Sequence, residues 1–263
     1  MADAAGGAAS PVPDDAARQG APARPGRAVA VVPLRDGTSG KSRLSHVLDP
    51  AARSRLVAVL ARHVVSTLLG SADVERVVVV TSDPRFAWRA LRDVVVDPAT
   101  ADAADGPPLL TDDADRLRIV LQPVDRGGLN AAVEVGREIA AEDGPVRVLV
   151  AHADLPALTT DDVAALLAED APVIVATDRH AAGTNLLALD PAAGEFRARF
   201  GLDSRASHMA EAERLGLRAV VVRRPGTATD LDTLDDWGEL PADVRAAVGR
   251  HVPALEERHP RPA

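Results

Sequence analysis

The chain of 263 residues has no cysteine, and aromatic residues make up only 2% of it. The lack of cysteine excludes disulfides, thiolate metal sites and a cysteine nucleophile. No uninterrupted apolar run is long enough to span a bilayer, and the opening stretch through Arg27 lacks the basic start and apolar segment of a signal peptide. A net charge of −9 and the scarcity of aromatic side chains argue against nucleic-acid binding. We therefore expect a cytoplasmic enzyme that binds neither membranes nor nucleic acid.

The distribution of apolar residues predicts one folded domain between two tails. Residues 1–26 are rich in Ala, Pro, Gly and Asp without hydrophobic periodicity, so we expect a disordered N-terminal tail. Residues 27–240 carry the apolar segments of a single folded domain, and residues 241–263 read as a short helix followed by a tail rich in Pro and Arg. Within the domain, the Asp, Gly and Pro clusters of residues 98–115 predict a mobile loop.

Short apolar runs alternate with helical patterns along the domain. We expect strands at residues 28–33, 76–83, 94–97, 117–122, 146–151, 172–177, 185–190 and 217–224. Helices are expected at residues 51–69, 130–141 and 160–169. Alternation of this kind predicts an α/β fold of Rossmann-like type, a mainly parallel mixed sheet flanked by helices on both faces, in which the last two strands run antiparallel.

Polar residues follow three of the strand-like segments. They are the loop "PLRDGTSGKSRL" (33–44), the turn containing Asp154, and "TDLDTLDDW" (229–237). Because ligands of such sheets bind beyond the carboxyl ends of the strands, we expect these three segments to meet in one cleft.

The first loop contains "GKS" at residues 40–42, which suggests a P-loop. The spacing argues against it, since the first glycine of that motif would fall at Arg35. Arg35, Lys41 and Arg43 still suit a triphosphate, because cations and backbone N–H groups of a glycine-containing loop can approach its oxygens. A solvated basic loop is the alternative for these residues.

The acidic residues of the other two segments suit a magnesium ion. Mg²⁺ prefers a few carboxylate oxygens together with phosphate oxygens and water, and Asp154 and Asp230 would supply the carboxylates. Taken singly, Asp154 could instead cap the turn before Pro156, and Asp230 and Asp232 could cap the helix that begins near Thr233. We expect Asp236, one turn into that helix, to face solvent.

The order of these motifs resembles the guanylyltransferases of coenzyme F420 biosynthesis. The resemblance runs from about Ala28 to Trp237 and is carried by the "KSRL" loop, "GGLNAAV", "ADLPAL", "GTNLL", "RFGLDSRASH" and "TDLDTLDDW". The combination of "GTN" with "RFG", "DS" and His208 is its most specific part. The resemblance implies a single-domain nucleotidyltransferase that transfers GMP from GTP to phosphoenolpyruvate or 2-phospho-L-lactate, with release of pyrophosphate.

The resemblance also implies roles for individual residues. The metal ligands would be Asp154 and Asp230, with Asp232 as a further ligand, and Lys41 would act in catalysis together with Asp154 and Asp230. The phospho-acid would lie near Thr184, Gly201 and Ser204. The nucleotide would contact Pro33, Leu34, Gly128 and Asn130, in addition to Arg35 and Arg43 from the charge argument.

Several alternatives stay open at this point. The acceptor could be a close relative such as 3-phosphoglycerate, or the chain could act on a sugar phosphate or molybdopterin. A P-loop phosphohydrolase and a non-catalytic nucleotide-binding module are less favoured. We assign no catalytic role to His152 or His208, and the oligomeric state is open, with a homodimer as one option.

Overall fold

The computed structural model describes residues 27–35, 41–97 and 110–257. The N-terminal tail, residues 36–40 of the basic loop, residues 98–109 of the loop predicted at 98–115, and residues 258–263 lie outside the described residues. Across the described ranges, no helix is both long and apolar enough to cross a membrane.

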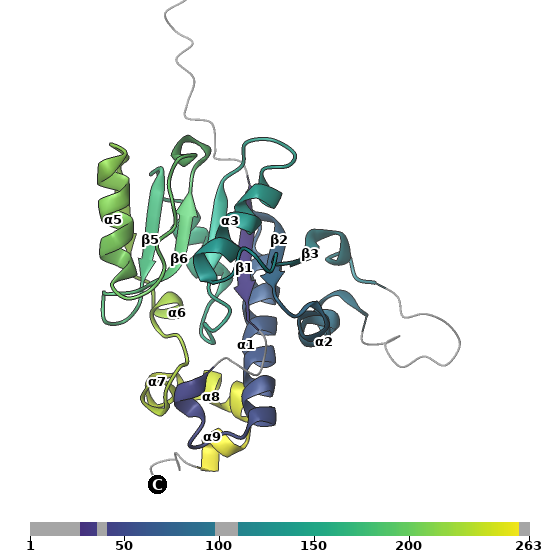
Figure 1. Ribbon diagram of the computed structural model, residues 1–263. Helices are drawn as coiled ribbons and strands as arrows, with labels where there is room; N and C mark the ends of the chain where they lie inside the picture. Colours follow the sequence, from purple (N-terminus) through teal and green to yellow (C-terminus); the bar gives the residue numbers. More distant parts are fainter. Residues whose placement is uncertain (1–26, 36–40, 98–109, 258–263) are drawn as a thin grey trace, which may run out of the picture.

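A seven-stranded sheet forms the centre of the molecule (Figure 1), in the order β3-β2-β1-β4-β6-β5-β7. Its strands are β1 (Ala28–Leu34), β2 (Val74–Thr81), β3 (Leu117–Leu121), β4 (Val148–Ala151), β5 (Val173–Thr177), β6 (Thr184–Leu189) and β7 (Ala219–Val222). Within this sheet only β6 runs against its neighbours, β4 and β5. The central strands are continuous runs of Val, Leu, Ile and Ala that are buried on both faces, as parallel strands covered by helices require. The predicted mixed, mainly parallel α/β sheet is confirmed.

Helices cover both faces of the sheet (Figure 1). On one face α1 (Pro50–Gly70), α2 (Pro84–Val95) and α4 (Thr160–Leu167) share a buried apolar cluster with the strands. On the other face α3 (Leu129–Ala140) and α5 (Ser204–Arg214) pack with a second cluster that includes Phe196 and Phe200. The connections within the described ranges include the short 3₁₀ helices η2 (Ser42–Leu44), η3 (Ala114–Arg116) and η4 (Pro191–Ala193).

A third apolar cluster joins segments that are far apart in the sequence. The short helices α7 (Leu234–Glu239), α8 (Ala242–Gly249) and α9 (Ala254–Glu257) gather beside α1 at one end of the molecule (Figure 1). They pack with Leu44, Leu48 and the first half of α1, and Trp237 is 1% exposed in this cluster. The C-terminal helices therefore anchor the residues that follow Lys41 and those that follow Asp232.

Two strand predictions are wrong. Residues 94–97 do not form a strand of the sheet, because α2 begins at the cap residue Asp83 and its helical apolar spacing continues to Val95. Val96 forms only an isolated bridge to Leu110. β7 is parallel to β5 rather than antiparallel, because α5 separates it from β6 and returns the chain to the edge where β5 also begins. The antiparallel prediction is confirmed for β6.

Candidate active site

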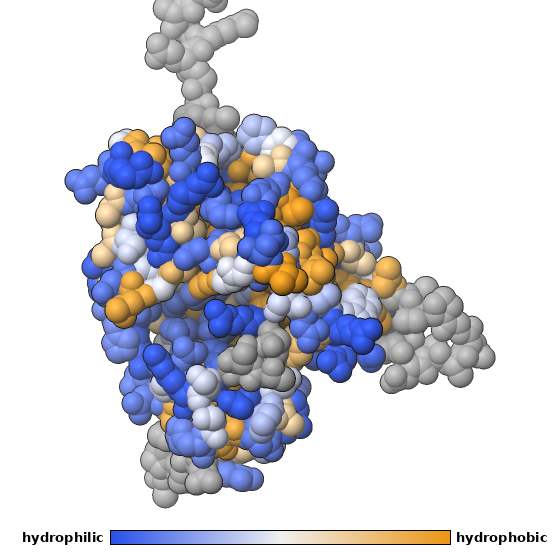
Figure 2. Space-filling model, in the orientation of Figure 1, coloured by the Kyte–Doolittle hydropathy of each residue, from blue (hydrophilic) through white to orange (hydrophobic). Residues whose placement is uncertain are grey.

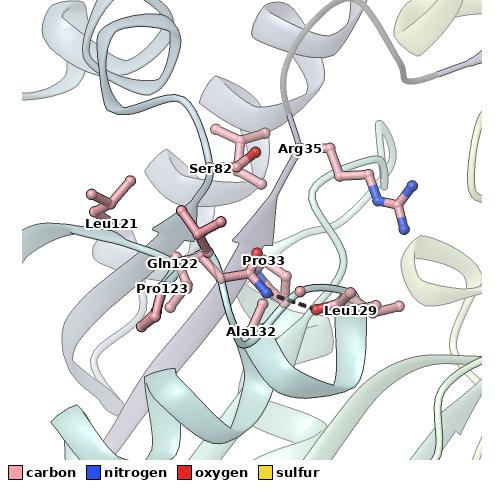
Figure 3. A pocket seen from close by; sticks show the side chains of 13 residues that line it. Pro33, Arg35, Ser82, Leu121, Gln122, Pro123, Leu129 and Ala132 are labelled. Atoms are coloured by element: carbon pink, nitrogen blue, oxygen red, sulfur yellow. Dashed lines mark hydrogen bonds between the residues drawn. The ribbon is translucent and has the colours of Figure 1, made fainter.

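A pocket of about 470 Å³ opens at the carboxyl ends of β1, β2 and β3, beside the start of α3 (Figure 3). Its lining includes four residues that the sequence predicts for the nucleotide: Pro33, Leu34, Arg35 and Gly128. Figure 3 shows the Arg35 side chain extending from the end of β1 away from Leu121 and Gln122. The edge of the sheet that was predicted to bind ligands is therefore hollowed where β1 to β3 end.

The start of α3 gives this pocket its polar groups. Gly128 caps α3 with a φ of 91°, a conformation that favours glycine, and the first N–H groups of the helix have no partner within the helix. Such an N-terminus attracts an anion. The Gln122 amide holds the approach to the helix by donating to the carbonyls of Arg126 (2.6 Å) and Gly128 (2.9 Å).

Apolar side chains give the pocket its outer wall. Leu121 is 57% and Val124 100% exposed, and Figure 2 shows hydrophobic surface around the position of β3 and the β3–α3 connection. Exposed apolar surface beside a polar helix end suits a ligand with a flat ring and a charged group.

Three carboxylates and one amine meet beyond the end of β4. Oxygens of Asp154, Asp230 and Asp232 lie within 4.8 Å of one another. Lys41 Nζ donates to Asp154 Oδ2 and to Asp232 Oδ1, each at 2.6 Å. The structure therefore brings together the lysine and all three aspartates that the sequence predicts for the metal site.

Lys41 is unusual in three respects. Its backbone is left-handed, with φ 57°, and its side chain is 7% exposed. It is also the only lysine in the sequence: lysines and arginines together number 30, and the other 29 are arginines. Burial opposes the charged amine, but the two paired carboxylates outweigh burial and raise its pKa above the ordinary value. Lys41 is therefore a permanent cation against the acidic cluster.

The pKa values of Asp154 and Asp230 are shifted in opposite directions. Burial raises the pKa of Asp154, but the charge of Lys41 outweighs it and holds that pKa below its ordinary value. Burial and the charges of Asp154 and Asp232 raise the pKa of Asp230. Among the described residues, Asp154 Oδ1 is buried and has no hydrogen-bond partner. One orphaned oxygen and one carboxyl with excess negative charge around it are what a bound cation would satisfy, so the donor set fits a divalent metal.

Backbone and side-chain contacts hold the two acidic segments together. Leu231 N donates to Asp154 O (3.1 Å), which joins the segment after α6 (Pro225–Ala228) to the turn after β4. The Asn185 amide donates to Thr227 O (2.8 Å), and Arg179 pairs with Asp236 (2.8 Å).

The prediction that Asp236 faces solvent is therefore wrong. Its side chain is 13% exposed. It forms a capping box with Thr233 at the start of α7 and also accepts from Asp232 N (3.0 Å). Because Asp236 binds the backbone of Asp232, which belongs to the acidic cluster, it cannot serve as an inert control for substitutions at Asp154 and Asp230.

The residues predicted for the phospho-acid lie at the same edge of the sheet. Gly201, with φ 139°, precedes α5, and Ser204 is buried at the first position of that helix. Thr184 opens β6 and is 1% exposed, with its hydroxyl 3.0 Å from His208 Nδ1. Because Arg199 N–H donates to His208 Nε2 (2.9 Å), the neutral ring carries its proton on Nδ1 and donates it to Thr184.

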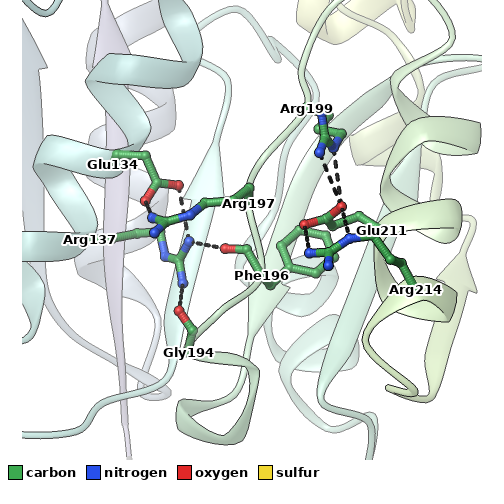
Figure 4. A network of polar contacts seen from close by, with 8 residues as sticks. All are labelled: Glu134, Arg137, Gly194, Phe196, Arg197, Arg199, Glu211 and Arg214. Atoms are coloured by element: carbon green, nitrogen blue, oxygen red, sulfur yellow. Dashed lines mark hydrogen bonds and ion pairs between the residues drawn. The ribbon is translucent and has the colours of Figure 1, made fainter.

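Two pairs of arginines clamp the segment that leads to Gly201 (Figure 4). The Arg137 guanidinium donates to Phe196 O, and both Arg137 and Arg197 pair with Glu134 of α3. On the other side, Arg199 and Arg214 pair with Glu211 of α5, whose side chain is 2% exposed. Residues 194–200 are thus fixed between the two helices of this face.

Asn130 completes this attachment. Its amide donates to Phe200 O (3.1 Å) and accepts from Phe200 N (2.7 Å), which is the pairing a neighbouring strand would offer. It lies in the first turn of α3 but is not among the residues that line the pocket. Arg43 is exposed on η2 and is likewise absent from the pocket lining. The structure thus places most of the predicted residues in three groups. These are the pocket, the acidic cluster of Asp154, Asp230 and Asp232 with Lys41, and the residues predicted for the phospho-acid (Thr184, Gly201 and Ser204).

The chain was then compared with known proteins. Residues 109–244 match the family described as guanylyl transferase CofC like. A phosphoenolpyruvate guanylyltransferase of Rubrobacter xylanophilus is 38% identical over 216 residues, which cover 81% of this chain and 93% of the relative. The chain belongs to the CofC-like guanylyltransferase family. The enzyme is therefore a nucleotidyltransferase, as the resemblance in its sequence predicts.

Other relatives differ in the acceptor they are named for. A 3-phospho-D-glycerate guanylyltransferase of Phenylobacterium zucineum is 32% identical to the enzyme over 230 residues, 86% of this chain and 93% of the relative. Among solved structures, a putative nucleotide-diphospho-sugar transferase of Desulfovibrio desulfuricans G20 is 12% identical, with a TM-score of 0.63 and coverage of 88% of this chain and 98% of that one. That last likeness shows the shared fold.

The sequence did not single out two polar residues of the pocket, Ser82 and Gln122. Each directly follows an observed strand, β2 and β3 respectively, whereas the predicted strands 76–83 and 117–122 include them. Their position close to the predicted carboxyl ends was the available signal, since loops at that edge face the ligand.

Proposed function

We propose that the enzyme transfers GMP from GTP to a small phosphorylated three-carbon acid, phosphoenolpyruvate or 2-phospho-L-lactate, and releases pyrophosphate. The proposal includes Mg²⁺ as the metal, a role in coenzyme F420 biosynthesis, a cytoplasmic location and a homodimer as the assembly. The observation that carries it is the cluster of Lys41 with Asp154, Asp230 and Asp232, placed between the pocket at β1 to β3 and the segment around Gly201.

The chemistry asks for charge neutralisation rather than for a general base. The phosphate of the acceptor is already ionised at neutral pH, so the barrier arises from repulsion between two polyanions and from their alignment. Lys41 would hold positive charge close to the transferred phosphate, and the N-terminus of α3 would receive negative charge of the nucleotide. Arg35 would add a further cation from the end of β1.

A metal ion would be held by Asp154 and Asp230, with Asp232 completing the set. When bound, Mg²⁺ would supply charge neutralisation and a template that orients the phosphates. The residues around it have separate tasks: Gly201 and Ser204 leave room for the carboxylate or phosphate of the acid, and Pro33, Leu34 and Gly128 face the nucleotide. Asn130 would act on the nucleotide side through the position of α3 and on the acid side through Phe200.

A panel of substrates tests the proposal. GTP and ATP would each be combined with phosphoenolpyruvate, 2-phospho-L-lactate, 3-phosphoglycerate and a hexose 1-phosphate, and products identified by mass. We expect pyrophosphate only when GTP and a phospho-acid are both present, and a GDP-capped acid as the product. Product from the sugar phosphate alone would favour the sugar nucleotidyltransferase alternative, which the fold shared with the Desulfovibrio protein permits. GTP hydrolysis without an acid, or binding without turnover, would contradict the proposal.

A further inference from the structure

His152 lies beside the acidic cluster, and its ring has no hydrogen-bond partner among the residues that the structure describes. It follows β4 and stands two residues before Asp154. Its backbone N–H donates to Asn185 O (3.1 Å), which fixes the backbone, whereas its ring nitrogen Nε2 is buried and unpartnered. A buried polar atom that lacks a partner is costly and uncommon in folded proteins. The residue as a whole is half-buried.

The ring of His152 lies between the acidic cluster and Phe200, which directly precedes Gly201. Its centroid is 5.1 Å from that of Phe200, and Phe200 in turn meets His208 edge-on at 4.9 Å. His152 is also near enough to Asp154 and to His208 to interact with both electrostatically. These contacts place His152 next to Phe200, the residue that precedes Gly201, and close to Asp154, the predicted metal ligand.

The order of the strands gives the same position. The nucleotide pocket lies at the ends of β1, β2 and β3, and Thr184 lies at the start of β6, on the other side of β4. His152, at the end of β4, is therefore between the two. The phosphate of an acceptor bound near Thr184 would approach a nucleotide in the pocket across this position.

Neighbouring polar groups are already engaged. Both nitrogens of His208 are hydrogen bonded, and both ends of the Asn130 amide bind Phe200. Lys41 is shared between two carboxylates. The ring of His152, by contrast, has no hydrogen-bond partner in the described part of the chain and can therefore bind an oxygen.

We propose that His152 is a substrate-binding residue, whose imidazole ring donates a hydrogen bond to a phosphate oxygen of the acceptor acid. The inference rests on the proposed function, because it needs a phosphorylated acceptor on the Phe200 side. It adds a binding group that the sequence motifs did not indicate. The alternative is that His152 only packs against Phe200, a task that a phenyl ring would also perform.

Two substitutions separate these alternatives. His152→Phe keeps a flat ring against Phe200 and removes both nitrogens, and His152→Gln restores a donor near the position of Nε2. We expect H152F to raise the KM for the acid by about tenfold or more, while the KM for GTP changes by less than about twofold, and H152Q to recover most of the loss. His251→Phe is the matched control, because His251 is exposed and follows α8.

Steady-state pyrophosphate release gives the KM values, and thermal melts establish that each variant is folded. An unchanged KM for the acid in H152F, or an equal rise in both KM values, would overturn the assignment. If H152F does not fold, the same comparison is made between His152→Leu and H152Q. Failure of the wild-type enzyme to form product with any phospho-acid would instead refute the proposed function, so the two failures are distinguishable.

Discussion

Replacement of Lys41 by Met should destabilise the enzyme when no divalent ion is present. The substitution keeps much of the side-chain length and leaves Asp154 and Asp232 without their cation. Breaking a fully buried ion pair costs about 3–5 kcal/mol. Here the carboxylate side chains of Asp154 and Asp232 are 26% and 39% exposed, so water offsets part of the loss. We expect a cost of about 2 kcal/mol, which for a chain of this size lowers Tm by roughly 4–8 °C.

A divalent ion should reverse this loss. In K41M the acidic cluster carries its full negative charge, whereas in the wild-type enzyme Lys41 already neutralises part of it. Mg²⁺ should therefore raise the Tm of K41M more than that of the wild-type enzyme. At a free concentration of about 100 times Kd, a ligand that binds only the folded state adds about 2.7 kcal/mol, enough to restore the variant.

The assay is calorimetry of both proteins across a Mg²⁺ titration. Arg250→Met is the control, because it removes one positive charge at an exposed residue outside the cluster. The single lysine offers an independent measurement, since its ε-ammonium group gives one NMR signal that should move as Mg²⁺ binds. Equal gains of Tm in K41M and wild type, together with an unmoved ammonium signal, would refute the reasoning.

Three further predictions concern the same site. Asp154→Asn and Asp230→Asn should each lower turnover about a hundredfold, equivalent to about 3 kcal/mol of lost transition-state stabilisation. Asp230→Asn should melt close to wild type, whereas Asp154→Asn also loses its ion pair with Lys41 and should melt at a lower temperature; the exposed Asp235→Asn is the control, and near-normal turnover in both variants would refute the metal-ligand assignment. ATP should give a kcat/KM at least about tenfold below that of GTP, since guanine and adenine present opposite donors and acceptors at the same edge; equal values in competition assays would contradict this. Burial, assisted by His152 and Arg199, lowers the pKa of His208 from 6.5 to about 4, so its contribution to stability is complete above pH 6.5 and is lost as the pH falls towards 4, by about 3 kcal/mol at most. Urea unfolding at pH 7 and pH 4.5 should show a smaller loss for His208→Gln, and an identical loss would contradict the assignment.

The sequence was most informative where hydrophobic pattern and strand ends coincide. β1, β4 and β5 are apolar runs of a kind that only a covered sheet can bury, so their existence and the edge that binds ligands could be predicted. Pairing was harder to predict. The segment of β7 gives no local sign of its direction, which depends on where α5 returns the chain.

The acidic cluster was predicted by residue type and order, whereas its supports were not. Nothing near Asp236 in the sequence indicates Arg179, because the two meet only through the fold. The same holds for Asn130, whose amide binds a backbone 70 residues away. The sequence also contains a signal for Lys41: it is the single lysine of the chain, and the other 29 residues of Lys or Arg type are arginines. Arginine, with a larger planar group, cannot replace a compact ammonium between two carboxylates without displacing them.

The reversed direction of β6 gives the two sides of the active site different supports. Most strands end at the active-site edge and continue into a connection that leads to a helix, so a change in the length of that connection displaces a helix. This holds for β1, β2, β3, β4 and β7. β5 and β6 are joined instead by the turn of residues 178–183, with both of its ends fixed in the sheet. This turn carries no helix of its own, but it is bonded to three of them: Arg179 pairs with Asp236 of α7 and donates its N–H to Ala228 O of α6, and Ala182 O accepts from Arg205 N of α5. The acceptor side is thus held by single contacts of one short turn, whereas the nucleotide side is held by whole helices packed on the core.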